Sequence, residues 1–144
     1  MKKIGFVGYS DENKYDEQKA KDIISVIFDK IMQKYCQDPN GEPIAIVSGA
    51  TNQGIPRLVY EQADAYNAKY GKWFMTIGIS AKEAYTCQLY PCDNIIAYGE
   101  KFGDESKMFI QYIDELYKIG GGRQSQHEFD MARAKNIPTT EYIL

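Results

Sequence analysis

Long apolar runs and clusters of basic residues are both missing from this sequence of 144 residues. No apolar stretch approaches the roughly 20 residues that cross a bilayer. The opening segment Met1–Val7 is followed by polar residues from Ser10 on, too soon for the apolar region of a secretory signal. The formal net charge is −3, and no basic stripe is present that could bind nucleic-acid phosphates. We therefore expect a cytoplasmic protein that binds neither a membrane nor nucleic acid.

Residues that bind metals or form disulfides are also scarce. His127 is the only histidine, and three cysteines, an odd number, suit a reducing compartment better than a disulfide framework. Cys87 and Cys92 are separated by four residues, so a zinc site would need a carboxylate ligand and a rare spacing. We expect no metal and no cofactor.

Tyrosine, by contrast, is abundant, with 12 residues. Its side chain combines a large contact surface with a polar tip, so the excess fits ligand pockets or subunit interfaces. The alternative is that these side chains cap the edge of the core.

Short apolar runs alternate with amphipathic segments along the chain. From Ile23 to Tyr35, apolar residues recur every three or four positions, which predicts a helix over about 16–37. The run Pro43–Val47 is continuously apolar, as in a strand buried on both faces. The irregular segment 80–93 is long enough to form a lid over a site. The predicted strands cover residues 3–8, 43–47, 73–79, 94–98, 115–119 and 138–144, and further helices begin near residues 55, 103 and 124.

This alternation predicts an α/β fold with a mostly parallel sheet and helices on both faces. No linker or internal repeat interrupts it, so we expect a single Rossmann-like domain over residues 1–144. Ligands of such sheets bind beyond the carboxyl ends of the strands. The loops after the first, second and fifth predicted strands are rich in glycine and serine, which places a candidate site there.

The clearest of these loops follows the fifth strand. Consecutive glycines allow positive φ and a close approach of the backbone to a ligand, and the next helix offers free N–H groups to an anion. Arginine can add a paired contact and serine a hydroxyl. The alternative is a tight turn without a ligand. The residues concerned are Gly120, Gly121, Gly122, Arg123, Gln124 and Ser125.

Glu128 follows this loop, and two roles are open for it. It can form a capping box with Ser125 as the N-cap of the helix. It can also face the sugar of a ligand whose phosphate lies on the glycines.

Two further loops are weaker phosphate-binding candidates. One contains Ser48, Gly49, Ala50 and Thr51, with Gly54 before the next helix, and the other contains Gly8, Tyr9 and Ser10. Both have the small residues that strand–helix corners share with phosphate sites. Arg57 and Lys107 lie near helix starts, where they can reach a phosphate or remain solvated surface charges.

Taken together, these segments resemble the SLOG superfamily, which includes the cytokinin-activating LOG enzymes and sensor domains for nucleotide signals. The resemblance covers nearly the whole chain. It rests on Gly8-Tyr9-Ser10, on Ile46-Val47-Ser48-Gly49-Ala50 with Gly54, and on Asp114–Gly122 followed by Glu128, Ala132 and Pro138.

LOG enzymes cut the N-glycosidic bond of nucleoside monophosphates, and the resemblance implies how their motif falls on this chain. Gly121 and Gly122 take the places of the family's glycines, Ser125 that of a threonine and Glu128 that of the catalytic glutamate. Gln124 replaces a glycine and Gly120 a proline. The family's catalytic arginine should fall around residues 105–107, where Lys107 is the only cation. A lysine does not replace the planar fork of arginine.

These observations lead to three hypotheses. The first is a sensor or sequestering protein for a small phosphate-bearing nucleotide, such as a mononucleotide, a cyclic nucleotide or an ADP-ribose derivative. The second is a phosphoribohydrolase in which Glu128 stabilises the cationic sugar. The third is a protein-binding scaffold with a vestigial site. The resemblance also implies a homodimer.

Overall fold

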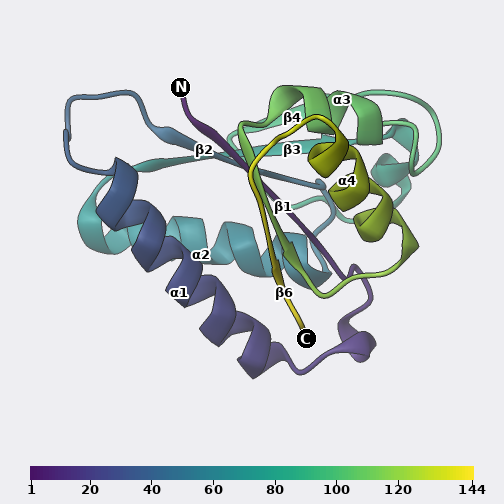
Figure 1. Ribbon diagram of the computed structural model, residues 1–144, viewed down its shortest axis with the longest axis horizontal. Coiled ribbons are helices and arrows are strands. Elements are labelled where there is room, and N and C mark those ends of the chain that lie inside the picture. Colours follow the sequence, from purple (N-terminus) through teal and green to yellow (C-terminus); the bar gives the residue numbers. More distant parts are fainter.

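A computed structural model describes all residues, 1–144, as one α/β domain built on a six-stranded sheet (Figure 1). All strand pairs are parallel, in the order β4-β3-β2-β1-β5-β6. The strands are β1 (Lys3–Gly8), β2 (Ile44–Ser48), β3 (Phe74–Ser80), β4 (Asn94–Ala97), β5 (Glu115–Ile119) and β6 (Thr139–Tyr142). The predicted fold class and all six predicted strands are confirmed.

Four α-helices cover the two faces of this sheet. They are α1 (Glu17–Tyr35), α2 (Gly54–Tyr70), α3 (Ser106–Tyr112) and α4 (Arg123–Ala134), with short 3-10 turns at Glu12–Lys14 and Lys82–Thr86. Helices α1 and α2 pack together on one side, and α3 and α4 pack together on the other (Figure 1). None of the helices combines the length and apolar character that a membrane crossing requires.

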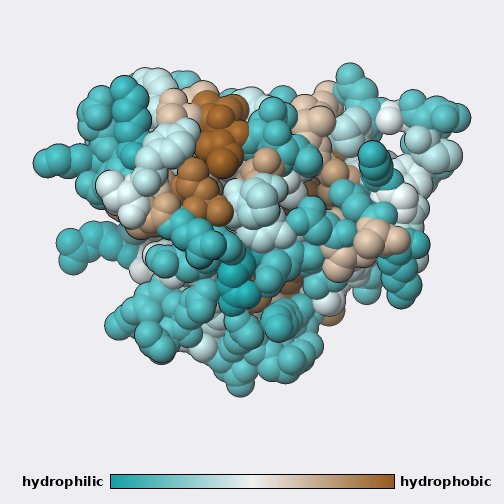
Figure 2. All heavy atoms as spheres, turned by 180° about the vertical axis from the view of Figure 1, so that it is seen from behind, coloured by the Kyte–Doolittle hydropathy of each residue, from teal (hydrophilic) through white to brown (hydrophobic).

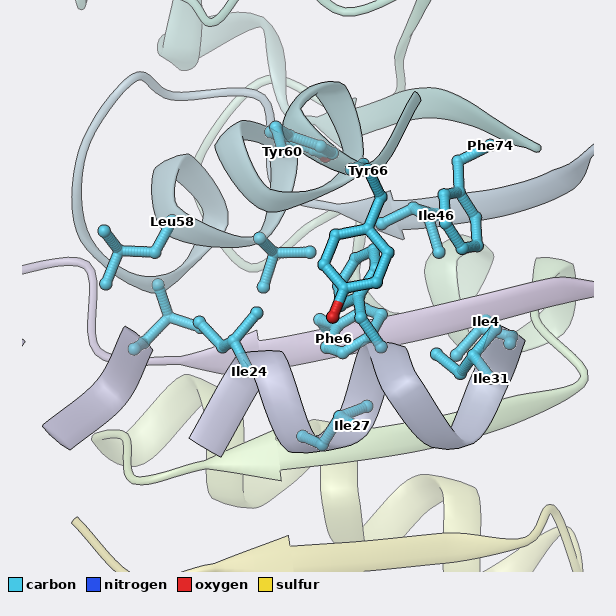
Figure 3. Packing of buried hydrophobic residues seen from close by; sticks show 14 of the residues in the cluster. Ile4, Phe6, Ile24, Ile27, Ile31, Ile46, Leu58, Tyr60, Tyr66 and Phe74 are labelled. Atoms are coloured by element: carbon cyan, nitrogen blue, oxygen red, sulfur yellow. The ribbon is translucent and has the colours of Figure 1, made fainter. Parts of the chain in front are cut away.

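Side-chain alternation along the strands separates the core into two clusters. Ile4 and Phe6 of β1 face α1 and α2, whereas Val7 faces α3 and α4. Because successive side chains of a strand point to opposite faces, an apolar run such as β2 supplies both clusters. Figure 3 shows the larger cluster, in which Ile24, Ile27 and Ile31 of α1 meet side chains of α2 and the first three strands.

Helix α1 illustrates how the sequence fixes an element. Its N-cap, Asp16, accepts hydrogen bonds from the backbone N–H groups of Gln18 and Lys19, which would otherwise lack partners. Its buried face carries Phe28, whose ring lies 5.8 Å from that of Phe6 and 5.2 Å from that of Phe74 between ring centres. The predicted apolar stripe is therefore the face that packs on the sheet.

The tyrosines lie mainly at the edges of the core. Tyr60, Tyr66 and Tyr90 are buried, and the hydroxyl of Tyr60 donates a hydrogen bond of 2.8 Å to the carbonyl oxygen of Gly49. Tyr9 is the only tyrosine that lines the pocket described below.

Seen from behind, the surface is mostly hydrophilic, and its most hydrophobic strip lies where Figure 1 places the edge strand β4 (Figure 2).

Candidate functional site

The strand order reverses between β1 and β5, and a pocket opens at this point. The chain moves from β1 outward to β4 and then returns to the other side of β1. Gly8 ends β1 and pairs in register with Ile119, which ends β5, so the loops after both strands diverge from the same place. Such a reversal leaves a crevice at the carboxyl ends of the strands, the usual position of ligands in open α/β sheets.

The pocket has a volume of about 510 Å³, within the range of small-molecule sites. The residues that line it come from the predicted loops and from segments around them: Val7, Gly8, Tyr9, Ser10, Asp11, Lys14, Ser48, Gly49, Thr51, Gln53, Pro56, Ile79, Ser80, Cys87, Phe102, Glu105, Phe109, Gly122, Arg123, Gln124, Ser125 and Glu128.

The three glycines after β5 have different roles. Gly120 and Gly121 have φ of +59° and +119°. A Cβ on Gly120 would lie 2.7 Å from the ring of Tyr9, and one on Gly121 would lie 2.7 Å from the Cβ of Ser125. Both positions thus require glycine for the fold itself, and neither lines the pocket.

Gly122 differs, because neither the backbone conformation nor the packing requires a glycine there. Its φ is −97°, and a Cβ there would meet nothing within 4 Å. Gly49 is similar: the nearest atom to an added Cβ would be the Oγ of Ser80 at 3.8 Å. Both residues line the pocket, so the backbone is left open toward it at two points.

The start of α4 has the features that suit an anion. Gly122 is the N-cap and provides no side-chain hydrogen bond, so the first N–H groups of this 12-residue helix remain free. Arg123 and Lys14 line the same pocket, and neither takes part in any ion pair of the structure. Free backbone donors and two unpaired cations thus face one cavity.

Two of the three predicted ligand-binding serines, Ser48 and Ser125, are hydrogen-bonded to the sheet. The hydroxyl of Ser125 donates to the carbonyl oxygen of Gly8 at 3.0 Å, and that of Ser48 donates to the carbonyl oxygen of Phe6 at 2.7 Å. Each oxygen can still accept a hydrogen bond. Because α4 begins at Arg123, the alternative in which Ser125 caps the helix and forms a capping box with Glu128 is wrong.

Glu128 instead forms part of a buried polar cluster at one end of the pocket. Its side chain is 6% exposed, and its Oε2 accepts a hydrogen bond of 2.9 Å from Ser106. Burial raises the pKa of Glu128 to about 7, and nearby Glu105 adds to the rise, while the hydrogen bond from Ser106 and the neighbouring Gln124 amide oppose it. A carboxyl group of this pKa exchanges protons near neutral pH.

Gln124 connects this cluster to the glycine loop. Its side-chain amide donates a hydrogen bond of 2.8 Å to Oε1 of Glu105, a residue that is itself buried. Gln124, which stands where the SLOG resemblance would place a glycine, therefore contacts a carboxylate of the pocket.

The segment after β1 forms another wall of the pocket, through Tyr9, Ser10, Asp11 and Lys14. Arg57 of α2 secures it. The Arg57 guanidinium pairs with Glu12 in this segment at 3.0 Å and also with Glu17 and Glu61. Arg57 is therefore neither a phosphate ligand nor an isolated surface charge.

Five of the predicted site residues lie outside the pocket lining: Ala50, Gly54, Lys107, Gly120 and Gly121. Lys107 is exposed on α3. Gly54 has φ of +67°, and an added Cβ would lie 2.3 Å from the carbonyl oxygen of Tyr9, so it allows two loops to pass closely. The remaining eleven are brought together, as the separate loops predicted.

Sequence reasoning missed Lys14 and Glu105 among the pocket residues. Lys14 lies four residues beyond Ser10, and a positive charge so close to a predicted phosphate-binding loop was the available signal. No signal in the sequence pointed to Glu105, because residues 105–107 were considered only as the place where the catalytic arginine of LOG enzymes should fall. The predicted lid region, 80–93, contributes only Ser80 and Cys87. No three His, Cys, Asp or Glu side chains come together as a metal site would require.

No protein-family model and no curated protein matches this sequence. Solved structures do match it. The X-ray structure of TM1055 superposes with a TM-score of 0.70 at 22% identity, over 96% of this chain and 72% of its own. The molybdenum cofactor carrier protein of Chlamydomonas reinhardtii gives 0.69 at 15% identity, over 97% and 75% of the two chains.

The molybdenum cofactor binding protein of the phototrophic bacterium Rippkaea orientalis gives 0.67 at 17% identity, over 99% of this chain and 77% of its own. At these identities the likeness concerns the arrangement of helices and strands, and it agrees with the Rossmann-like fold that the sequence predicted. The chain therefore shares the fold of these three proteins over nearly its whole length.

Proposed function

We propose that the protein binds a small phosphate-bearing nucleotide, or a ligand derived from one, and holds it as a sensor or sequestering protein of SLOG type. The observation that carries this proposal is the open backbone at Gly122, next to the free N–H groups of α4 and the unpaired side chains of Lys14 and Arg123. Backbone donors, a helix N-terminus and cations together suit a phosphate.

The buried cluster of Glu105, Ser106 and Glu128 favours holding over cleavage. Cleavage of a glycosidic bond needs a carboxylate on the sugar and groups that orient the phosphate and the base. Here the segment that should supply an arginine supplies buried Glu105. Two proteins of the same fold are a carrier and a binding protein for the molybdenum cofactor, which also supports a holding role.

A phosphoribohydrolase is the second candidate, and the raised pKa of Glu128, about 7, favours it. A general acid or base works best with a pKa near the operating pH. Glu128 would then assist an incoming water while it stabilises the cationic sugar.

The experiment is ligand recovery with a matched pair of variants. Purified protein is incubated with mononucleotides, cyclic nucleotides, ADP-ribose and the molybdenum cofactor, and both the solution and the heat-released contents are chromatographed. Intact ligand recovered from the protein supports holding, whereas catalytic release of free base supports the hydrolase. If neither intact ligand nor free base is found, and no ligand raises the melting temperature, the third hypothesis, a protein-binding scaffold, remains.

Gly122→Asp should abolish ligand retention, because it places a negative side chain in the open space that a phosphate would occupy. His127→Asp is the control, since it adds the same charge to an exposed position of α4 outside the pocket. Gly121→Asp would be less informative because φ of +119° makes any side chain there a strain on the fold. Unchanged retention in Gly122→Asp would contradict the proposed phosphate position.

The proposal also includes a cytoplasmic homodimer, supported by the SLOG resemblance and by the three free cysteines. Light scattering after size-exclusion chromatography measures the assembly directly, and a monomeric mass would overturn this part alone.

A further inference from the structure

Two carboxylic acids meet in the pocket lining, next to the first turn of α4, where Gln124 donates to one of them. Glu105 is 5% exposed and Glu128 is 6% exposed, yet both line the cavity. They come from different elements, since Glu105 precedes α3 and Glu128 lies in the second turn of α4. We call this pair the carboxyl floor.

The hydrogen bonds of the carboxyl floor leave one acceptor unused. Glu105 accepts from the backbone N–H of Gly103 at Oε2 and from Gln124 at Oε1. Glu128 accepts from Ser106 at Oε2 only, so its Oε1 receives no hydrogen bond from the protein. A carboxyl oxygen that is open to a cavity and receives no hydrogen bond from the protein is positioned to accept one from a ligand.

No cation compensates the carboxyl floor. Neither glutamate takes part in any ion pair, and every group that donates to them is neutral. The other acidic residue of the pocket, Asp11, lies in the segment after β1 and accepts from the backbone N–H of Asn13. Above pH 7, where Glu128 is mostly ionised, an additional anion placed on this floor would meet uncompensated negative charge in a poorly solvated place.

Within the carboxyl floor, Glu105 lies beside the first turn of α4, where it accepts from Gln124, and Glu128 lies further along the helix. Arg123 and Glu128 are five residues apart on α4, which corresponds to a rise of about 7.5 Å along the helix. This is of the order of one sugar ring with its phosphate linkage. A ligand with its phosphate at Gly122 would therefore bring its next polar groups to the floor.

We infer that Glu105 and Glu128 determine the polarity of the ligand: the floor accepts a part that donates hydrogen bonds, such as a ribose diol, and rejects a second anionic group there. This inference rests on the proposed function and deepens it. It makes Glu105 a specificity-determining residue, in a segment where the SLOG resemblance led us to expect a positive charge.

The test compares adenosine 5′-monophosphate with adenosine 3′,5′-bisphosphate, which differ by one phosphate on the ribose. Isothermal titration calorimetry gives both dissociation constants for each protein. For the unmodified chain we expect the bisphosphate to bind at least about tenfold more weakly, because its second phosphate meets the carboxyl floor.

Glu105→Gln should reduce the difference between the dissociation constants of the two probes, since it removes one negative charge while the side chain keeps nearly the same shape. Glu105→Arg should reverse it, and Glu100→Arg is the control, because Glu100 is an exposed carboxylate outside the pocket. Circular dichroism and melting temperature establish that each variant is folded. If Glu105→Arg fails to fold, Glu105→Gln still decides the question.

The outcomes separate the two proposals. Equal affinity of the unmodified chain for both probes, or an unchanged ratio in Glu105→Gln, overturns the inference and leaves phosphate binding intact. Binding of neither probe, together with no ligand recovered from the wider panel, overturns the proposed function, and the inference falls with it. A ratio that follows the charge at position 105 supports both.

Discussion

At the scale of single residues, Glu128 links the pocket to the stability of the whole chain. Burial raises its pKa from 4.5 to about 7, so between these values the folded protein holds a proton that the unfolded chain releases. The free energy of unfolding should therefore fall as the pH rises from about 4.5 to 7. The contribution of this group is of the order of 3 kcal/mol.

Glu128→Gln should remove most of this slope, because the amide does not titrate. Urea unfolding at several pH values between 4.5 and 7.5 measures it, with Glu100→Gln as an exposed control. A slope that persists unchanged in Glu128→Gln would show that other groups cause it.

At the scale of elements, the segment between β1 and α1 is the part of the pocket wall most dependent on charge. Arg57 joins it to α1 and α2 through Glu12, Glu17 and Glu61, and Glu12 also accepts a hydrogen bond of 3.1 Å from the backbone of Gly54. Arg57→Met keeps the aliphatic stem and removes all three ion pairs. We expect a loss of about 1 kcal/mol, smaller at high salt, because the group is partly exposed.

The more specific readout is hydrogen exchange. Residues 9–16 should exchange faster in Arg57→Met, while the strands keep their protection. Lys21→Met is the control, since Lys21 pairs only with Glu17 at 3.5 Å and is about half exposed. Equal exchange in both variants would mean that packing, rather than the ion pairs, holds the segment.

At the scale of the whole molecule, one sheet separates two apolar clusters, and its strands supply side chains to both. We therefore expect a single cooperative unfolding transition. Ile110→Ala removes a fully buried side chain of α3 and should cost about 2–5 kcal/mol. Trp73, which packs against the cluster on the other side of the sheet, reports on the far face.

Fluorescence of Trp73 and far-ultraviolet circular dichroism should shift by the same amount in Ile110→Ala. Val26→Ala, at a position 49% exposed on α1, should leave the midpoint nearly unchanged. Separate shifts of the two signals would mean that the faces unfold independently.

Some site residues are placed by contacts that are local in the chain and others by distant contacts, and this explains which of them could be predicted. Gly8 and Ser48 end β1 and β2, and Gly122 lies three residues after the end of β5, so their place at the carboxyl edge of the sheet follows from chain order alone. Lys107 follows Ser106 in the chain, but helical geometry directs the two side chains differently, and only Ser106 reaches Glu128. Glu105 meets Gln124 across 19 residues, a contact that no local pattern records.

The sequence by itself determined the order of helices and strands, the parallel sheet and the loops that converge on the site. These depend on periodicity, on glycine and proline positions and on the handedness of crossovers, which act over short stretches. Only the tertiary structure decided which glycines serve the fold and which open the pocket. It also decided that two carboxylates, rather than a carboxylate and a cation, form its floor. Burial and charge pairing arise between segments far apart in the chain, so they become visible only when those segments are packed together.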